Sequence, residues 1–393
     1  MNNLIEVYHY GDCGKFDDYN PFKLIDEKYI SEMLYHIGKS EPYTLGLKEL
    51  HEIFGVDIDV LKSKIKKMIA LDLINVKDHV FSVNFTMIFE KDLTAIDNFS
   101  KIMALEISEV IIKNKDEIYK LAENFISSRS HDIDELLYHI IGSHILDGLA
   151  IDTLSESGLF KTSKVQKDNR DYILFGFEKS TKVDEFSENI LCSCNNYRTE
   201  KLSFVSFGDA AGKRNDFYRF NRQVSSQINK VNAREETKAD YINLLEKTNH
   251  EIVIKCSQIV RMIIDNNNEY MKFNDEEILY VNYLKSFRYL ECDKNQYKVS
   301  VPIFYQADKQ IIADIHDLLI EIILPILEVR FTSAKEKLEI SAIKHGVDIK
   351  EVLNEMWHQV FGNINEQLVK EEMIKTPEYI KGEGRYLKAI YLE

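Results

Sequence analysis

Cysteine, proline and glycine are all scarce in this sequence of 393 residues. Five cysteines are too few for a disulfide-built secreted scaffold, so we expect reduced thiols. Five prolines and 15 glycines provide few helix breakers, which favours a mainly helical chain. No run of about 18 apolar residues occurs, and residues 1–20 lack the basic start and apolar centre of a signal peptide. The sequence therefore predicts a cytoplasmic protein without a membrane span.

Basic residues are also fewer than acidic residues in this sequence. The chain has 50 basic and 65 acidic residues, which gives a net charge of -15. Because the molecule as a whole repels phosphate, any contact with nucleic acid requires a local basic patch. The length and the 45% hydrophobic content suit two or three domains.

An internal repeat organises the chain. An alternating strand pattern at 80–85 matches one at 297–303, and each is followed by a helical pattern with apolar residues three and four apart. The copies then align through Asp132 and Asp348, and both close on a β-like segment that begins at Arg170 or Arg385. We expect two diverged copies, at 28–178 and 236–393, folded as a pseudo-dimer. The alternative is a chance match of amphipathic patterns.

Residues 28–85 carry the most specific pattern. Helices are expected at 29–38, 45–55 and 57–71, with Gly55 as a left-handed helix cap, and two strands follow around a turn at 77–79. Ile58, Leu61, Ile65, Met68 and Ile69 are expected to form the apolar stripe of the third helix. The phrase LKELHEIFGVDIDVLKSKIKKMIALDLI resembles the winged helix-turn-helix family of bacterial transcription regulators.

The resemblance implies that the third helix enters the major groove of double-stranded DNA. It would place Lys62, Ser63, Lys66 and Lys67 near phosphates or base edges, with Lys77 and His79 at the tip of the wing. Lys213 and Arg214, in the middle of the chain, would add a second phosphate contact. Two features depart from a DNA reader: Asp57 and Asp59 occupy the first turn of the helix, and the helix has no arginine. A lysine face that contacts protein is the alternative.

The expected fold is mainly α with small β wings, made of two copies of a winged helix plus a helical domain with a central β-hairpin insertion. The second winged helix is degenerate, because its equivalent helix starts with Asp275, Glu276 and Glu277. We interpret Leu202 to Asn221 as the hairpin. The expected domains are an N-terminal arm at 1–27, a winged helix at 28–89, a helical domain at 90–178, a linker with the hairpin at 179–235, the degenerate winged helix at 236–306 and a second helical domain at 307–393.

Enzymatic signals are weak throughout. His131, His139 and His144 have the wrong spacing for metal ligands on one helix face, and Cys192 and Cys194 lack the setting of a redox pair. The phrase GDAAGKRND from Gly208 is one residue short of a phosphate-binding loop. No nucleophile turn is present. We therefore expect no enzyme, no catalytic residue, no metal and no cofactor.

The leading functional prediction is a DNA-binding transcription regulator that uses the first winged helix and carries a ligand or partner site in its helical domains. The alternative is a non-enzymatic interaction or assembly factor whose winged helices contact protein. In either case the expected partners include another protein or a second copy of the chain, and no membrane.

Overall fold

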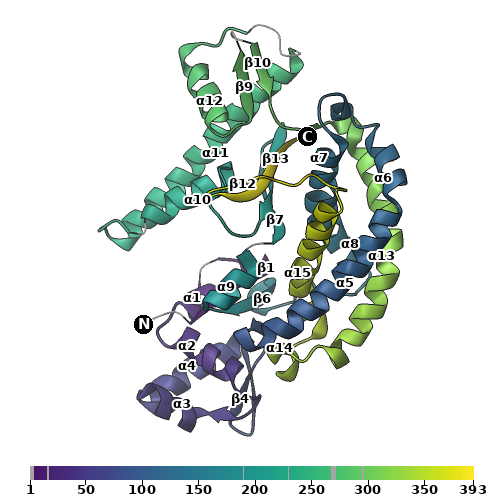
Figure 1. The fold of residues 1–393 in the computed structure, drawn as a ribbon. Helices are drawn as coiled ribbons and strands as arrows, with labels where there is room; N and C mark the ends of the chain where they lie inside the picture. The colour runs from purple at the N-terminus through teal and green to yellow at the C-terminus, as the bar shows by residue number, and fades with distance from the viewer. Residues whose placement is uncertain (1–3, 16, 189, 229, 267–270, 294–295) are drawn as a thin grey trace. The chain divides into compact units, whose positions relative to one another are not determined.

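The computed structural model describes residues 4–15, 17–188, 190–228, 230–266, 271–293 and 296–393 (Figure 1). The fold is mainly helical with small sheets, as the composition predicts. The chain divides into two compact units, each assembled from three separate stretches. Unit 1 comprises 1–108, 149–188 and 321–364, and unit 2 comprises 109–148, 189–320 and 365–393. Neither unit therefore coincides with the domains expected from the sequence, each of which was a single continuous stretch.

Unit 1 begins with the segment that carries the most specific sequence pattern. Its helices and strands follow in the order α2 (Ile30–Lys39), β2 (Leu45–Gly46), α3 (Leu47–Phe54), α4 (Ile58–Ala70), β3 (Ile74–Lys77) and β4 (Val80–Val83). The three strands form one sheet in the order β2-β4-β3. Gly55 ends α3 with a φ of 59°, and the carboxylate of Asp57 accepts the Asp59 N–H at the start of α4. These local signals explain why the helix boundaries were predictable from the sequence.

The apolar stripe of α4 is narrower than predicted. Leu61, Ile65 and Met68 are buried in the core of this segment, but Ile58 and Ile69 are 39% and 44% exposed. The prediction was wrong for these two isoleucines, because the helical period places them at the edge of the face that Leu61, Ile65 and Met68 turn to the core.

The N-terminal segment is not the irregular arm that was expected. β1 (Ile5–Asp12) pairs antiparallel with β6 (Asp171–Glu178), and β5 (Thr86–Ile88) pairs parallel with β6 on its other side. Gly11 approaches β6 so closely that an added Cβ would lie 2.1 Å from the carbonyl oxygen of Asp171. The lack of a side chain at Gly11 therefore permits a close strand pairing.

Segments that are about 250 residues apart in the sequence pack together inside unit 1. The buried carboxylate of Asp92 accepts the backbone N–H of Phe89 at 3.0 Å and both the N–H and the hydroxyl of Ser341 at 2.9 Å. His345 Nδ1 lies 2.9 Å from the Ser82 hydroxyl. The remaining helices that lie within this unit are α1 (Pro21–Ile25), α8 (Ala150–Glu156), α9 (Thr181–Glu188) and α14 (Ser341–Lys344).

Three long helices contribute residues to both units: α5 (Leu93–Lys113), α13 (Lys309–Lys337) and α15 (Ile349–Lys370). Pro325 lies inside α13, and the helix continues past this proline. Unit 2 adds α6 (Lys115–Ala122), α7 (Ile133–Leu137) and a π-helical stretch at Tyr138–Leu149 that runs on into α8.

Unit 2 contains a sheet in the order β11-β13-β8-β7. Its strands are β7 (Leu191–Arg198), β8 (Leu202–Asp209), β11 (Ile303–Phe304) and β13 (Gly384–Leu392), and the short β12 (Tyr379–Ile380) also pairs with β13. The predicted hairpin at 202–221 was wrong. β8 pairs with the preceding β7, and the aromatic-rich second half forms α10 (Phe217–Ile228). Its aromatics follow a helical spacing that the nearby turn residues obscured.

The rest of unit 2 packs on that sheet. α11 (Glu235–Asp265), α12 (Asp275–Ser286), β9 (Leu290–Asp293) and β10 (Gln296–Val299) follow in order. Their apolar side chains share one core with β8 and β13, which includes Val260, Leu284, Phe204 and Ile390. The Asn274 side chain accepts the Glu277 N–H and caps α12, which explains why this helix was predictable.

Candidate functional site

The lysines expected to contact DNA lie on the outer face of α4, but most are already paired. Lys62 lies 3.0 Å from Asp59, and Lys67 lies 2.5 Å from Glu27. Lys64 also pairs with Glu27. Burial acts to raise the pKa of Glu27, but its two lysine partners outweigh that effect and lower it. Two lysines on this face therefore share a carboxylate that would compete with a phosphate.

The other predicted residues of this segment are exposed. Ser63 and Lys66 face outward from α4, Lys77 ends β3, and His79 lies in the turn between β3 and β4. Asp78 and His79 both have a positive φ, as the tight two-residue turn requires. Residues 28–88 contain eight lysines and eight acidic residues, so the segment has no net charge apart from its histidines.

Of the basic pair predicted in the middle of the chain, Arg214 is buried and is not available to a phosphate. Arg214 is 1% exposed and donates to the carbonyl oxygens of Ser206 and Asp209. The prediction was wrong for Arg214, because this guanidinium is used inside the fold. Lys213 is exposed beside it.

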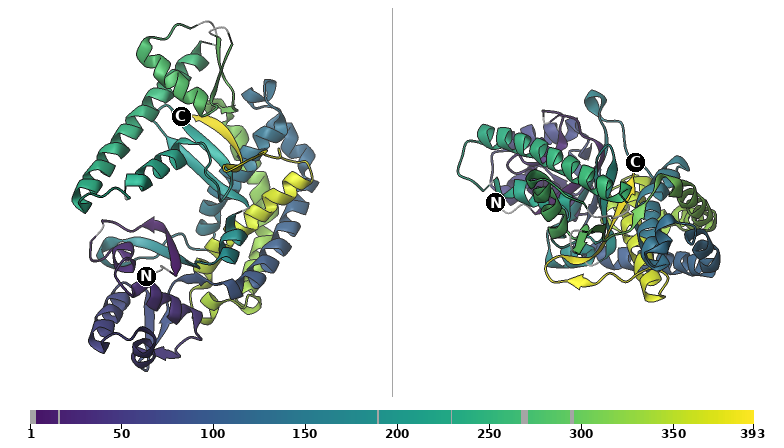
Figure 2. Two further views of the ribbon diagram at one scale, coloured as in Figure 1. Left: turned by 60° about the vertical axis from the view of Figure 1, so that its left-hand side comes forward. Right: turned by 90° about the horizontal axis from the view of Figure 1, so that it is seen from above.

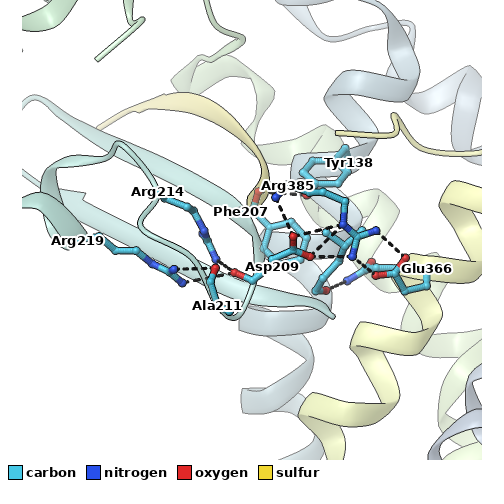
Figure 3. A network of polar contacts seen from close by, with 10 residues as sticks. Tyr138, Phe207, Asp209, Ala211, Arg214, Arg219, Glu366 and Arg385 are labelled. Carbon is cyan, nitrogen blue, oxygen red and sulfur yellow. Dashed lines mark hydrogen bonds and ion pairs between the residues drawn. The ribbon is translucent and has the colours of Figure 1, made fainter. Parts of the chain in front are cut away.

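A network of partly buried charges holds the loop that follows β8 in place (Figure 3). The guanidinium of Arg385 lies 2.7 Å from Asp209 and 2.6 Å from Glu366. The hydrogen bonds to Glu366 and Asp209 raise the pKa of Arg385, with burial opposing them. The network ties the end of β8 to the start of β13 and to α15.

The loop after β8 has the opposite polarity to a phosphate cradle. Arg219 donates to the carbonyl oxygens of Ala210, Ala211 and Gly212 (Figure 3). Burial lowers the pKa of Arg219 to about 10, which leaves the side chain charged at neutral pH. A loop whose carbonyl groups converge on a cation repels an anion. Here the loop fixes the first turn of α10.

Several large apolar side chains left exposed in unit 2 lie on and between α10 and α11, two helices that lie side by side (Figure 2). We define the arm patch as six residues with exposed fractions between 37% and 64%: Tyr218, Phe220, Val224, Val231, Tyr241 and Leu244. Phe220 and Val224 are four residues apart and Tyr241 and Leu244 are three apart, so each pair shares one helix face. Tyr218 and Phe220 fall within the predicted hairpin at 202–221, so their helical spacing was not recognised from the sequence.

Burial shifts the pKa values of two candidate metal and redox residues, His139 and Cys194. Burial lowers the pKa of His139 to about 4, so it is neutral at physiological pH. Within the described residues, no group of three or more histidine, cysteine or acidic side chains is arranged to hold a metal ion. Burial, followed by the nearby Asp147, raises the pKa of Cys194 to about 12, which keeps it a thiol. Cys192 and Cys194 form no disulfide.

No family model, curated protein or solved structure matches the chain. No helix in the described part of the chain is both long and apolar enough to cross a bilayer. The function must therefore be inferred from the side chains that the fold presents.

Proposed function

We propose that this chain is a non-enzymatic assembly protein, built from two diverged copies of a winged helix plus helical module, that pairs with a second copy of itself through the arm patch. The single observation that carries the function is the set of six large apolar side chains exposed on and between α10 and α11. Exposed apolar clusters of this kind mark surfaces that another protein covers.

Matching sheet connections support the duplication. In unit 1, β6 has β5 as a parallel neighbour and β1 as an antiparallel neighbour. In unit 2, β13 has β11 as a parallel neighbour and β8 as an antiparallel neighbour. β6 begins directly after Arg170, and β13 begins at Gly384 and includes Arg385. The sequence repeat aligns the chain at these two arginines. The same mixed pairing recurs with the same order along the sequence.

Two buried aspartates add to this support. Asp92 caps the short helix after β5 and also accepts the N–H of Ser341, which lies in the later part of the chain. Asp308 caps the short helix after β11 at Tyr305 and also accepts the N–H of Ile126, which lies in the earlier part. Each copy therefore uses its aspartate to bond a segment that belongs to the other copy.

The winged-helix part of the proposal is supported by the order of elements. The order α2-β2-α3-α4-β3-β4, with the sheet order β2-β4-β3, provides a helix-turn-helix followed by a two-stranded hairpin. In the later copy, the end of α11, α12, β9 and β10 provide a reduced version.

Charge supports the choice of a second copy as the partner. Residues 217–234 contain four basic and no acidic residues. Residues 236–246 contain Glu236, Asp240 and Glu246 against one lysine. A two-fold pair that places α10 of one copy against α11 of the other brings opposite charges together around the apolar side chains.

Site-specific photo-crosslinking tests the pairing. A benzophenone side chain at Val224 should yield a covalent species of twice the chain mass in the purified protein. The same group at Leu279, which is 67% exposed on α12 and outside the arm patch, is the matched control. A yield at position 224 no greater than at position 279 would refute the proposed pairing.

A second candidate function, the DNA-binding regulator, is favoured by the exposure of Ser63, Lys66, Lys77 and His79 on α4 and the wing. The pairing of Lys62, Lys64 and Lys67 with carboxylates disfavours it. Gel retention of duplex DNA at about 50 mM salt decides between the two, because phosphate contacts weaken steeply with salt. Salt-sensitive retention that Lys62→Glu with Lys66→Glu abolishes would establish the second candidate.

A further inference from the structure

Lys388 is a buried lysine at a position that the strand pattern assigns to the core. Successive β-strand residues point to opposite faces, so Lys388 shares its face with Tyr386, Ile390 and Leu392. Those three residues are buried, and Lys388 itself is only 7% exposed. A lysine at such a position requires an explanation, since burying an ammonium group without an anionic partner is costly.

The ammonium nitrogen of Lys388 has aromatic surroundings. Nζ donates to the carbonyl oxygen of Phe287 and lies 4.9 Å from the ring centre of Tyr289, 5.5 Å from that of Tyr386 and 5.7 Å from that of Phe287. No carboxylate within the described residues forms an ion pair with it. Burial lowers the pKa of Lys388 to about 7; Asp216 and Glu383 oppose the shift, and Arg288 adds to it.

The same lysine lines a pocket of about 280 Å³ within unit 2. Arg288 and Lys375 supply two further cations to the lining, and Ser300 supplies a hydroxyl. Lys375 lies 3.6 Å from Glu135, which also lines the pocket together with Glu378. Arg288 is exposed and is held with a φ of 58°. The pocket therefore combines a buried amine with cationic groups that suit a small anion.

We propose that this pocket binds a small carbonyl compound that bears a carboxylate or phosphate group, and that Lys388 holds it as an imine. The neutral amine attacks the carbonyl carbon and forms a C–N bond, while the C=O π bond breaks to give a carbinolamine. Loss of water then gives the C=N bond, so the step needs no oxidant or reductant. A lysine desolvated among apolar groups is nucleophilic at neutral pH. Arg288 and Lys375 hold the anionic group.

Reductive trapping of the full-length protein tests this proposal. The probe is glyoxylate, an aldehyde with a carboxylate, and cyanoborohydride reduces any imine to a stable amine. Peptide mass spectrometry at pH 7 should show Lys388 labelled at least about tenfold faster than the exposed Lys230, because an ordinary lysine has a pKa near 10.4. The rate at Lys388 should level off above about pH 8, whereas the rate at Lys230 keeps rising.

Two comparisons test the ligand class. Propionaldehyde, which lacks the anion, should label Lys388 at least about fivefold more slowly than glyoxylate, because one charge-assisted contact contributes on the order of 1 kcal/mol. Arg288→Ala with Lys375→Ala should remove that preference, whereas Lys298→Ala, a lysine outside the pocket, should not. Labelling of Lys388 no faster than Lys230 would overturn the reactive amine. Equal rates with the two aldehydes would overturn the anionic ligand class.

Discussion

At Arg385, one guanidinium is shared by two carboxylates in a mostly buried position. The side chains of Arg385 and Asp209 are 23% and 6% exposed, whereas those of Lys62 and Asp59 on α4 are 52% and 85% exposed. Removing one partner of a buried pair leaves an uncompensated charge, but water replaces the partner of an exposed pair. The two pairs should therefore respond very differently to the loss of a cation.

We predict that Arg385→Met lowers the free energy of unfolding by about 3 kcal/mol. Lys62→Met, the matched control, should change it by less than about 1 kcal/mol. Urea denaturation of both variants measures the difference. Equal effects would mean that the network in Figure 3 does not stabilise unit 2.

A second prediction concerns His345, whose Nε2 lies 3.1 Å from the carbonyl oxygens of Gly38 and Ser40. Burial lowers the pKa of His345, with those two carbonyl groups opposing the shift. In the unfolded chain this histidine has a pKa of about 6.5. Below that pH the unfolded chain binds a proton more readily than the folded chain does, so stability falls as the pH drops. His345→Gln should make the decline in the urea midpoint between pH 7 and pH 5 shallower. If the urea midpoint of the variant declined as steeply as that of the natural chain, His345 would not contribute to the loss of stability at low pH.

At the scale of single elements, Gly55 and Gly208 are both required by the fold, but for different structural reasons. A Cβ at Gly208 would lie 2.0 Å from the carbonyl oxygen of Arg385, whereas a Cβ at Gly55 would meet nothing within 4 Å. Gly55 needs only its positive φ of 59°. Gly208 allows β8 to approach β13, so its replacement must move a strand.

We predict that Gly55→Ala costs roughly 1 kcal/mol, which is the strain of a left-handed residue. Gly208→Ala should cost more than about 3 kcal/mol, because a backbone clash in a central strand cannot relax locally. Thermal unfolding followed by circular dichroism compares the two variants. Similar melting temperatures would contradict the close approach of β8 and β13.

Elements with local signals were predictable from the sequence, and elements fixed by distant contacts were not. The Gly55 cap and the apolar residues of α4 predicted the boundaries of α3 and α4 within two residues. By contrast, β1 pairs with a strand about 160 residues later and β8 pairs with the end of the chain. Pairings at such separations leave no local pattern, so the arm at 1–27 and the hairpin at 202–221 were wrong.

For the candidate site residues too, what depends on the local sequence was predictable and what depends on distant contacts was not. The exposure of Lys66 and Lys77 agrees with helix periodicity and turn position. The pairing of Lys67 with Glu27 joins residues 40 apart, and the burial of Arg214 depends on the loop that follows β8. Lys388 carried a usable signal, since it interrupts an alternation of apolar residues, but a single charged residue in a terminal strand is commonly solvent-facing.

At the scale of the whole molecule, the arm patch is the feature that folding alone does not explain. The six apolar side chains on and between α10 and α11 remain between 37% and 64% exposed in the fold of unit 2. Their burial in a pair of chains would contribute the hydrophobic free energy that the isolated chain forgoes. The proposal therefore predicts a protein whose state of association depends on concentration and on this patch.

Sedimentation equilibrium measures this property directly. Between roughly 1 and 100 µM the natural chain should sediment as a dimer, which corresponds to a dissociation constant of about 1 µM or tighter. Tyr241→Lys with Leu244→Lys should give a folded monomer, because the new ammonium groups would be buried against the basic α10 of the partner. Leu279→Lys should remain a dimer. A natural chain that stays monomeric throughout this range, or a dimer that the double variant leaves intact, would contradict the account.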